Sequence, residues 1–156
     1  MIIIAAMSED GVIGAGDGMP WNVPAEYRQF LDYIRGETVI MGRRSFEIFG
    51  SDLTSARNLV VSRSVAAVEN AEVVPSFEAA VRRGKELGGT LYCAGGASIY
   101  RAAIPVAERM YLSYIRGDYS GDVRFPEFDR ADWQIARREA HPEFRFVEYR
   151  RIRPSR

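Results

Sequence analysis

Short apolar runs and amphipathic segments alternate through most of the chain. Residues 2–7 form an unbroken apolar run rich in β-branched isoleucine, and similar runs occupy 38–41, 59–62 and 90–94. A strand that is apolar on both faces is typical of a parallel sheet covered by helices. These runs therefore predict the central strands of a buried sheet, and residues 72–74 predict a weaker strand.

Helical patterns lie between the predicted strands. Pro24 opens a segment whose apolar residues recur at i, i+3, i+4 and i+7 until Gly36 ends it, so one face of this helix is expected to be buried. Shorter helices are expected over 43–50, over 77–87 behind a serine cap, and over 97–103.

The pattern changes after Pro105. Residues 110–115, 133–138 and 144–152 are expected to be strands with no helices between them, which is typical of an antiparallel ending. The chain shows no internal repeat or linker. We therefore expect one α/β domain over residues 1–156, a mainly parallel twisted sheet with flanking helices on both faces and an antiparallel C-terminal hairpin.

The charge balance and the rarity of cysteine and histidine narrow the function classes. Lys+Arg and Asp+Glu both number 21, so the net charge is zero and no overall field favours nucleic acid or an anionic membrane. The single cysteine, Cys93, lies in an apolar run, which excludes an internal disulfide and fits a reducing, cytoplasmic compartment. With His141 as the single histidine, we expect neither a metal site nor a histidine-based triad. The apolar start is too short for a signal peptide or a membrane span, and we expect a cytoplasmic monomer.

A glycine loop leads into the first predicted helix. Gly11, Gly14, Gly16 and Gly18 give this loop backbone freedom, and Trp21 stiffens its exit. The combination predicts a mobile flap followed by a fixed anchor.

Glu26, an acidic residue of this predicted helix, is a candidate functional residue. It lies beside Tyr27 and one turn before Phe30, at the edge of the apolar stripe, where its carboxyl would be partly desolvated. Two interpretations stay open at this point. Glu26 either favours the helix dipole and caps free N–H groups, or is a functional acid held against an apolar wall.

Two strand–glycine–helix corners, Gly42-Arg43-Arg44-Ser45 and Gly95-Gly96-Ala97-Ser98, are expected at the carboxyl edge of the sheet, where open α/β sheets bind ligands. Positive charge is unfavourable in a first helical turn, so a bound anion would explain the two arginines. Ser62-Arg63 adds a hydroxyl and a cation at another strand end. These features indicate a phosphate on a nucleotide ribose, and so NADP(H) rather than NAD(H). Simple turns and solvated arginines are the alternative interpretation.

The same residues belong to a longer series of motifs. In chain order the series is Ala5-Ala6, Gly11-Val12-Ile13-Gly14, Met19-Pro20-Trp21-Asn22-Val23-Pro24 followed by Glu26 and Phe30, Val39-Ile40-Met41-Gly42-Arg43, Asn58-Leu59-Val60-Val61-Ser62-Arg63, Gly95-Gly96 with Tyr100, Tyr111-Leu112-Ser113, Gly121-Asp122 and Phe125-Pro126. In order and spacing, along nearly its whole length, the chain resembles the dihydrofolate reductases.

This resemblance implies that NADPH passes a hydride to the pteridine ring of dihydrofolate and that a proton is added at the neighbouring ring nitrogen. Glu26 would bind the pterin and promote the protonation, with a pKa raised toward neutrality by its apolar wall. Ser113 would hydrogen-bond both Glu26 and the pterin. Asp122 would latch the glycine loop when it closes, and Gly95-Gly96 is a cis peptide in relatives.

The resemblance also implies three sets of site residues. The catalytic set is Glu26, Trp21 and Ser113. The substrate-binding set is Ile4, Ala5, Glu26, Tyr27, Arg28, Phe30, Phe49, Leu53, Arg57, Ala94 and Ser113. The cofactor-binding set is Ala6, Ile13, Gly14, Met19, Gly42, Arg43, Arg44, Ser45, Ser62, Arg63, Gly95, Gly96, Ala97, Ser98, Ile99 and Tyr100.

The main departure from the family pattern concerns the glutamate tail of folate. Ala56 replaces an arginine that usually clamps a tail carboxylate, and Leu31 replaces a residue that is often basic. Arg57 lies one residue along a strand and so points to the opposite face. Arg28, on the same helix as Leu31, would partly compensate, and the sequence leaves open which of Arg28 and Arg57 reaches the tail. Ala94 would leave extra room at the pterin.

Two rival functions stay open, and the departure motivates the first of them. The first is a reductase of the same fold that acts on another pterin or on a riboflavin-pathway pyrimidine. The second is a nucleotide- or pterin-binding protein without turnover, against which the partly buried Glu26 argues.

Overall fold

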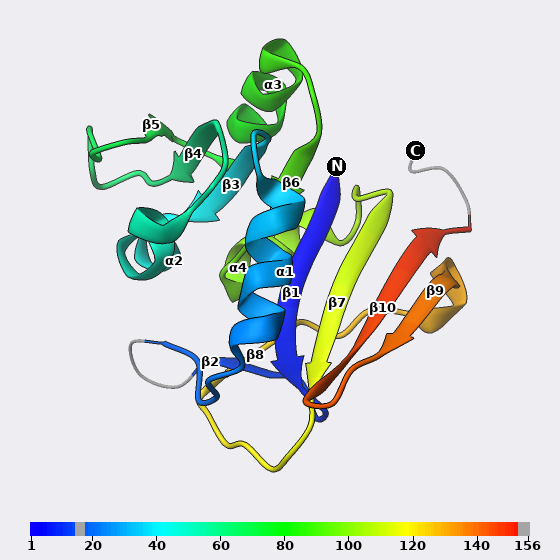
Figure 1. Cartoon of the computed structure of the whole chain (residues 1–156). Coiled ribbons are helices and arrows are strands. Elements are labelled where there is room, and N and C mark those ends of the chain that lie inside the picture. Colours follow the sequence, from blue (N-terminus) through cyan, green and yellow to red (C-terminus); the bar gives the residue numbers. More distant parts are fainter. Residues whose placement is uncertain (15–17, 153–156) are drawn as a thin grey trace.

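We describe residues 1–14 and 18–152 of a computed structural model of the chain (Figure 1). In chain order the elements are β1 (Ile2–Ser8), β2 (Val12–Gly14), α1 (Pro24–Ile34), β3 (Thr38–Gly42), α2 (Arg43–Phe49), the 3₁₀ turn η1 (Gly50–Asp52), β4 (Arg57–Val61), β5 (Glu72–Val74), α3 (Phe77–Leu87), β6 (Leu91–Cys93), α4 (Ala97–Ala103), β7 (Arg109–Ile115), β8 (Val123–Arg124), the 3₁₀ turn η2 (Arg130–Asp132), β9 (Trp133–Ala140) and β10 (Phe144–Arg151). The strands and helices expected from the apolar pattern are all present, with bounds close to those predicted.

The main sheet has eight strands in the order β5-β4-β3-β6-β1-β7-β10-β9. From β5 to β7 all neighbours are parallel, whereas β10 runs antiparallel to both β7 and β9. This arrangement confirms the predicted α/β fold, a mainly parallel sheet with an antiparallel C-terminal strand pair.

The strand order brings separate parts of the chain to one edge of the sheet. The chain passes from β1 to β3 and returns later to insert β6 between them. Because these strands are parallel, their carboxyl ends meet at the same edge. A crevice is expected where the strand order reverses.

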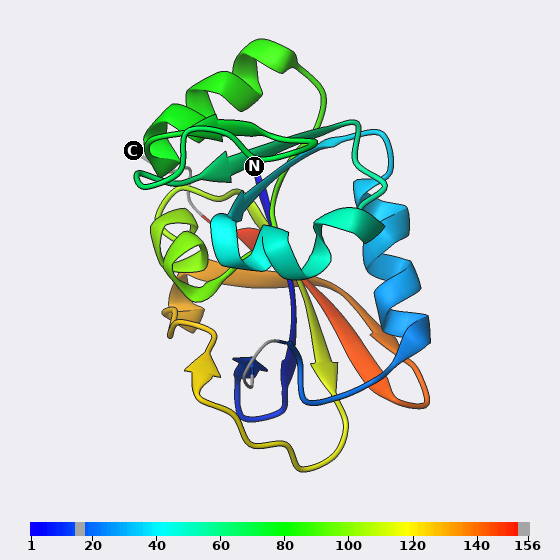
Figure 2. The ribbon, with the colours of Figure 1, turned by 90° about the vertical axis from the view of Figure 1, so that its left-hand side faces the viewer.

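Helices cover both faces of the sheet, as predicted. Side chains alternate along β1, so Ile3 packs in the core cluster that contains Ala80 of α3 and Tyr100 of α4. Ile4 packs in the opposite cluster, with Ile34 of α1. Figure 2 shows α1 and α4 on opposite sides of the sheet.

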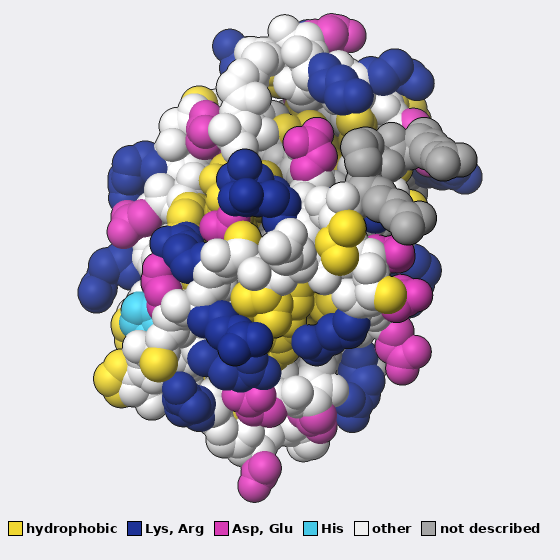
Figure 3. Space-filling model, turned by 90° about the vertical axis from the view of Figure 1, so that its right-hand side faces the viewer, with side chains coloured by type: hydrophobic (Ala, Val, Ile, Leu, Met, Phe, Trp, Pro, Cys, Tyr) yellow, Lys and Arg dark blue, Asp and Glu magenta, His cyan; other side chains and the backbone are white. Residues whose placement is uncertain are grey.

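Strand β9 forms one edge of the sheet and carries many charges. The side chains from Gln134 to Arg138 are exposed, and Arg137 lies 2.7 Å from Glu139 and 3.5 Å from Glu148. Figure 3 faces this side of the molecule and shows basic and acidic side chains interspersed over it. Charged side chains on an exposed edge strand disfavour pairing with another sheet.

The apolar pattern does not predict the short antiparallel pair of β2 and β8. The two strands are brought together by a close backbone approach, because a Cβ at Gly121 would lie 2.2 Å from the carbonyl oxygen of Gly14. Only glycine permits such an approach. The pair holds the described end of the glycine loop against the segment before β8, whereas Gly16 lies outside the described residues.

No helix in the described part of the chain is long and apolar enough to cross a membrane.

Candidate active site

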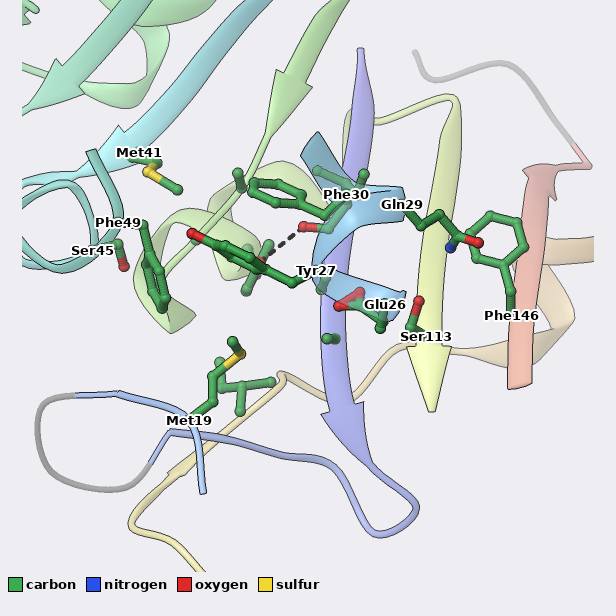
Figure 4. A pocket seen from close by; sticks show the side chains of 18 residues that line it. Met19, Glu26, Tyr27, Gln29, Phe30, Met41, Ser45, Phe49, Ser113 and Phe146 are labelled. Atoms are coloured by element: carbon green, nitrogen blue, oxygen red, sulfur yellow. Dashed lines mark hydrogen bonds between the residues drawn. The ribbon is translucent and has the colours of Figure 1, made fainter. Parts of the chain in front are cut away.

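A pocket opens at the carboxyl edge of the sheet (Figure 4). We call it the inner pocket; its lining is Ile4, Ala5, Ala6, Ile13, Met19, Glu26, Tyr27, Gln29, Phe30, Met41, Ser45, Phe49, Ala94, Gly95, Gly96, Tyr100, Ser113 and Phe146. Most of these side chains are apolar, so a charged group that faces the pocket is poorly solvated.

Glu26 lies in the first turn of α1 and faces the inner pocket with 6% of its surface exposed. Burial disfavours its ionised form and raises the pKa of Glu26 to about 7, as predicted. Among the contacts of the described residues, its carboxyl forms no hydrogen bond to the backbone of the first helical turn. The capping interpretation requires such a hydrogen bond, so the structure favours the other interpretation, in which Glu26 is a desolvated acid against an apolar wall.

Ser113 of β7 faces the same pocket and is 3% exposed. Figure 4 shows its hydroxyl on the strand beside the Glu26 carboxyl. In the described part of the chain no direct hydrogen bond joins the two groups. The structure thus brings the predicted pair together without the direct bond between them.

Tyr100 of α4 ties the second glycine corner to β1. Its hydroxyl donates a hydrogen bond to the carbonyl oxygen of Ile4 at 2.9 Å, within the pocket wall (Figure 4). The Gly95–Gly96 peptide is cis, as the resemblance implied. Gly95 has a φ of +112°, and a Cβ there would lie 3.2 Å from the Tyr100 hydroxyl, so both backbone and space require glycine.

The two predicted glycine corners lie against each other. The Gly42 N–H donates to the Gly95 carbonyl oxygen at 2.8 Å, and a Cβ on Gly96 would lie 3.3 Å from Ser45 Oγ. The corner after β3 and the corner after β6 therefore form one continuous edge beside the inner pocket.

Cationic and hydroxyl side chains border this edge. Arg43 and Arg63 are exposed, and the contact of Arg43 with Glu47, 3.7 Å, is an exposed pair that contributes little. Ser62 Oγ accepts hydrogen bonds from the N–H groups of Ser64 and Val65, both at 3.3 Å, which orders the turn after β4. Solvated cations thus lie beside the backbone at Gly95, where only glycine fits. Such an arrangement suits a phosphate-bearing nucleotide such as NADPH.

Comparison with known proteins places these features in one family. The dihydrofolate reductase family model matches residues 1–151. The chain belongs to the dihydrofolate reductase family.

Named relatives agree with this assignment. Dihydrofolate reductase type 3 of Salmonella typhimurium is 38% identical over 141 residues, covering 90% of this chain and 86% of that protein. Dihydrofolate reductase of Neisseria gonorrhoeae is 39% identical over 140 residues, covering 87% and 85%. The structure of dihydrofolate reductase from Enterococcus faecalis, complexed with NADP(H) and RAB-propyl, has the same fold with a TM-score of 0.89 at 24% identity, covering 97% of this chain and 96% of that one.

This family member has a second opening beside the inner pocket, between α1 and the segment 48–52. We call it the outer groove; its lining is Met19, Trp21, Asn22, Val23, Pro24, Glu26, Tyr27, Arg28, Leu31, Ile48, Phe49 and Asp52. Trp21 lines this groove rather than the inner pocket and packs edge-on against Tyr119, with ring centroids 5.6 Å apart. Arg28 also reaches the groove.

Two predicted substrate residues lie outside both linings. Leu53 is partly buried against the core cluster beneath α1, and Arg57 is exposed at the start of β4. Arg28 is therefore the cation that the fold places at the outer groove.

Several predicted cofactor residues lie beside the inner pocket rather than in its lining. They occupy the ends of β2, β3 and β4 and the first turns of α2 and α4; they are Gly14, Gly42, Arg43, Arg44, Ser62, Arg63, Ala97, Ser98 and Ile99. Asp122 is exposed immediately before β8 and forms no hydrogen bond to the described part of the glycine loop, whose residues 15–17 lie outside the described residues.

Three lining residues were not predicted as site residues: Gln29, Met41 and Phe146. Met41 and Phe146 belong to largely buried strands whose apolar residues mark them only as core residues. Gln29 lies one turn after Glu26, so helical periodicity is the one signal that could have placed it beside that acid.

Proposed function

We propose that this chain catalyses the NADPH-dependent reduction of 7,8-dihydrofolate to 5,6,7,8-tetrahydrofolate. Membership of the dihydrofolate reductase family supports the reaction. The observation that carries the proposal for this chain is Glu26, a single acid held in an apolar pocket with a pKa of about 7. A proton donor that works near neutral pH needs such a value.

When bound, NADPH supplies the hydride. Glu26 accepts hydrogen bonds from the amino-pyrimidine side of the pterin and promotes protonation of the ring nitrogen next to the carbon that receives the hydride. Ser113 orients the pterin from β7, and the apolar walls of Phe30 and Phe49 hold the ring and exclude water.

The binding of NADPH falls to the continuous edge formed by the glycine corners. Backbone groups at Gly95 and Gly96 allow a close approach of the cofactor, and Ser45 lies against them. Arg43, Arg63 and Ser62 would hold its phosphates and ribose.

The test is the oxidation of NADPH in the presence of dihydrofolate by the wild type and by Glu26→Gln. We expect kcat/KM at neutral pH to fall by about 10²–10⁴-fold in the variant, because glutamine cannot donate the proton. Glu78→Gln is the matched control, since Glu78 is also a first-turn acid but is exposed on α3. Full activity of Glu26→Gln would remove the assigned role.

A second candidate, the reduction of another pterin or a riboflavin-pathway pyrimidine, is favoured by one observation. Arg57 lies outside both linings, and Ala56 supplies no cation, so Arg28 is left to hold a substrate carboxylate. Comparison of dihydrofolate with 6-methyl-7,8-dihydropterin, which lacks the tail, separates the two. Tight NADPH binding without oxidation by any pterin would favour a non-catalytic binding protein instead.

We also infer that the chain is one domain that works as a cytoplasmic monomer and binds no nucleic acid. The interspersed charges on the β9 edge (Figure 3) support the monomer, the zero net charge supports the lack of nucleic-acid binding, and the single cysteine, Cys93, fits a reducing compartment. Sedimentation of the purified protein at several concentrations tests the monomer.

A further inference from the structure

A hydrogen bond spans the passage between the inner pocket and the outer groove. The Tyr27 hydroxyl of α1 donates to the Asp52 carboxylate of η1 at 2.9 Å, joining residues on opposite walls of the groove. The Thr54 hydroxyl donates to the Leu31 carbonyl oxygen and ties the same two segments one turn further on.

The Tyr27 ring stands where the two spaces meet. Met19, Glu26, Tyr27 and Phe49 line both the inner pocket and the outer groove. The ring packs between Phe30, with centroids 6.0 Å apart, and Phe49, with centroids 6.4 Å apart. Figure 4 shows Tyr27 extending across the pocket toward Phe49.

The space on the two sides of this ring is unequal. The inner pocket has a volume of about 100 Å³, and the outer groove about 520 Å³. Pockets that hold a small-molecule ligand usually measure about 300–1,000 Å³. A ring bound at Glu26 therefore needs side chains to move, and a substituent that continues into the outer groove must pass Tyr27.

We propose that Tyr27 and Asp52 form a clasp that determines specificity by opposing substrates whose substituent leaves the inner pocket through the outer groove. This inference rests on the proposed function, because it concerns the substrate of that reaction. A long substituent has to displace the Tyr27 ring, which breaks a hydrogen bond to a charged acceptor. A pterin with only a small substituent leaves the clasp closed.

Charge adds to the selection. Once Tyr27 moves away, the Asp52 carboxylate faces the groove without its hydroxyl partner and repels an anionic substituent, while Arg28 on the same groove attracts it. The clasp therefore disfavours most strongly the binding of a substrate whose long substituent carries carboxylates.

The test compares kcat/KM for dihydrofolate and for 6-methyl-7,8-dihydropterin in the wild type, Tyr27→Phe and Asp52→Asn. Tyr27→Phe keeps the ring and removes the donor, and we expect its ratio of dihydrofolate to methylpterin efficiency to rise by about three- to tenfold. Asp52→Asn should raise the ratio at least as much, because it also removes the negative charge. The gain should appear mainly as a lower KM for dihydrofolate.

Asp32→Asn is the matched control. Asp32 is an exposed acid of α1 that pairs with Arg35 at 3.1 Å and lies outside both linings, so its variant should leave the ratio unchanged. The clasp alone would be overturned if the wild type reduces dihydrofolate but the ratio in Tyr27→Phe and Asp52→Asn stays at the wild-type value or falls. A wild type that reduces neither pterin would overturn the proposed function and the clasp with it.

Discussion

The inner pocket lies beside the continuous edge formed by the two glycine corners, which we call the cofactor edge because NADPH is proposed to bind there. Both lie at the carboxyl end of one sheet, yet the charged groups of the pocket are buried and those of the edge are exposed. Glu26 is 6% exposed among apolar side chains, and that burial raises its pKa to about 7. Arg43 and Arg63 are exposed at the edge of the same site.

The difference follows from what each group has to do. An acid that gives up a proton near neutral pH needs a destabilised charge, which desolvation provides. A cation that attracts phosphate needs a stable charge within reach of the ligand, and water does not prevent this. Under the proposed function, the reaction would therefore depend on burial at one side of the site and on exposed charge at the other.

The pH dependence of activity gives the largest expected effect. About half of Glu26 is protonated at its pKa of about 7 and about 1% at pH 9, so kcat/KM of the wild type should fall by about fiftyfold between pH 7 and pH 9. The decline is measured from initial rates with dihydrofolate at each pH. A plateau to pH 9 would show that the burial of Glu26 does not control the proton step.

Stability should respond to the same burial. The folded pKa of Glu26, about 7, lies above its ordinary 4.5, so the folded state binds more protons in this window and stability falls as the pH rises through it. Glu26→Gln cannot ionise and should raise the free energy of unfolding by up to about 3 kcal/mol at pH 8, with no such gain at pH 4. Urea titration at the two pH values measures this, and an equal gain for Glu78→Gln would contradict the cause.

Loss of an exposed cation should weaken the binding of NADPH and leave the pKa of Glu26 unchanged. We expect Arg43→Gln and Arg63→Gln each to raise the KM for NADPH by about tenfold, because each removes a charge-assisted hydrogen bond. The pH at which kcat/KM halves should stay where it is in the wild type. Arg35→Gln, an exposed cation at the far end of α1, should behave as the wild type.

Salt should give the smallest effect and sharpen the contrast further. Raising the ionic strength from about 0.1 M to 1 M shortens the screening length from about 10 Å to 3 Å, so the KM for NADPH should rise about threefold. The midpoint of the pH profile should not move, because desolvation sets the pKa of Glu26. A midpoint that shifts as strongly as the KM would mean that exposed charges control Glu26.

Local patterns in the sequence account for much of the fold. The doubly apolar runs predict the parallel strands, and Ser76 caps α3 as its position suggests, with its Oγ accepting from the Ala79 N–H at 3.0 Å. Local patterns do not predict the pair of β2 and β8, because strands of three and two residues are too short to show a hydrophobic periodicity. What joins them is the close approach of Gly121 to Gly14, a contact between distant segments.

In the candidate site, too, local sequence patterns predict some features, whereas contacts between distant segments determine others. The position of Glu26 at the edge of an apolar helix face predicted a partly desolvated carboxyl and left a capping role open, and the two glycine corners were consistent with either simple turns or a nucleotide site. The contact between Gly42 and Gly95, the bond of Tyr100 to Ile4 and the clasp of Tyr27 with Asp52 join residues far apart in the chain. Periodicity along one segment says nothing about such partners.

The sequence by itself thus determined the class of the fold and marked Glu26 and the glycine corners as candidate site residues, since each of these depends on neighbours within a few turns of the chain. The tertiary structure alone decided how deeply Glu26 is buried, that Arg57 lies away from the outer groove while Arg28 reaches it, and that Asp52 meets Tyr27. The physical reason is that solvation and long-range hydrogen bonds depend on every atom packed around a group, and those atoms come from segments that only folding brings together.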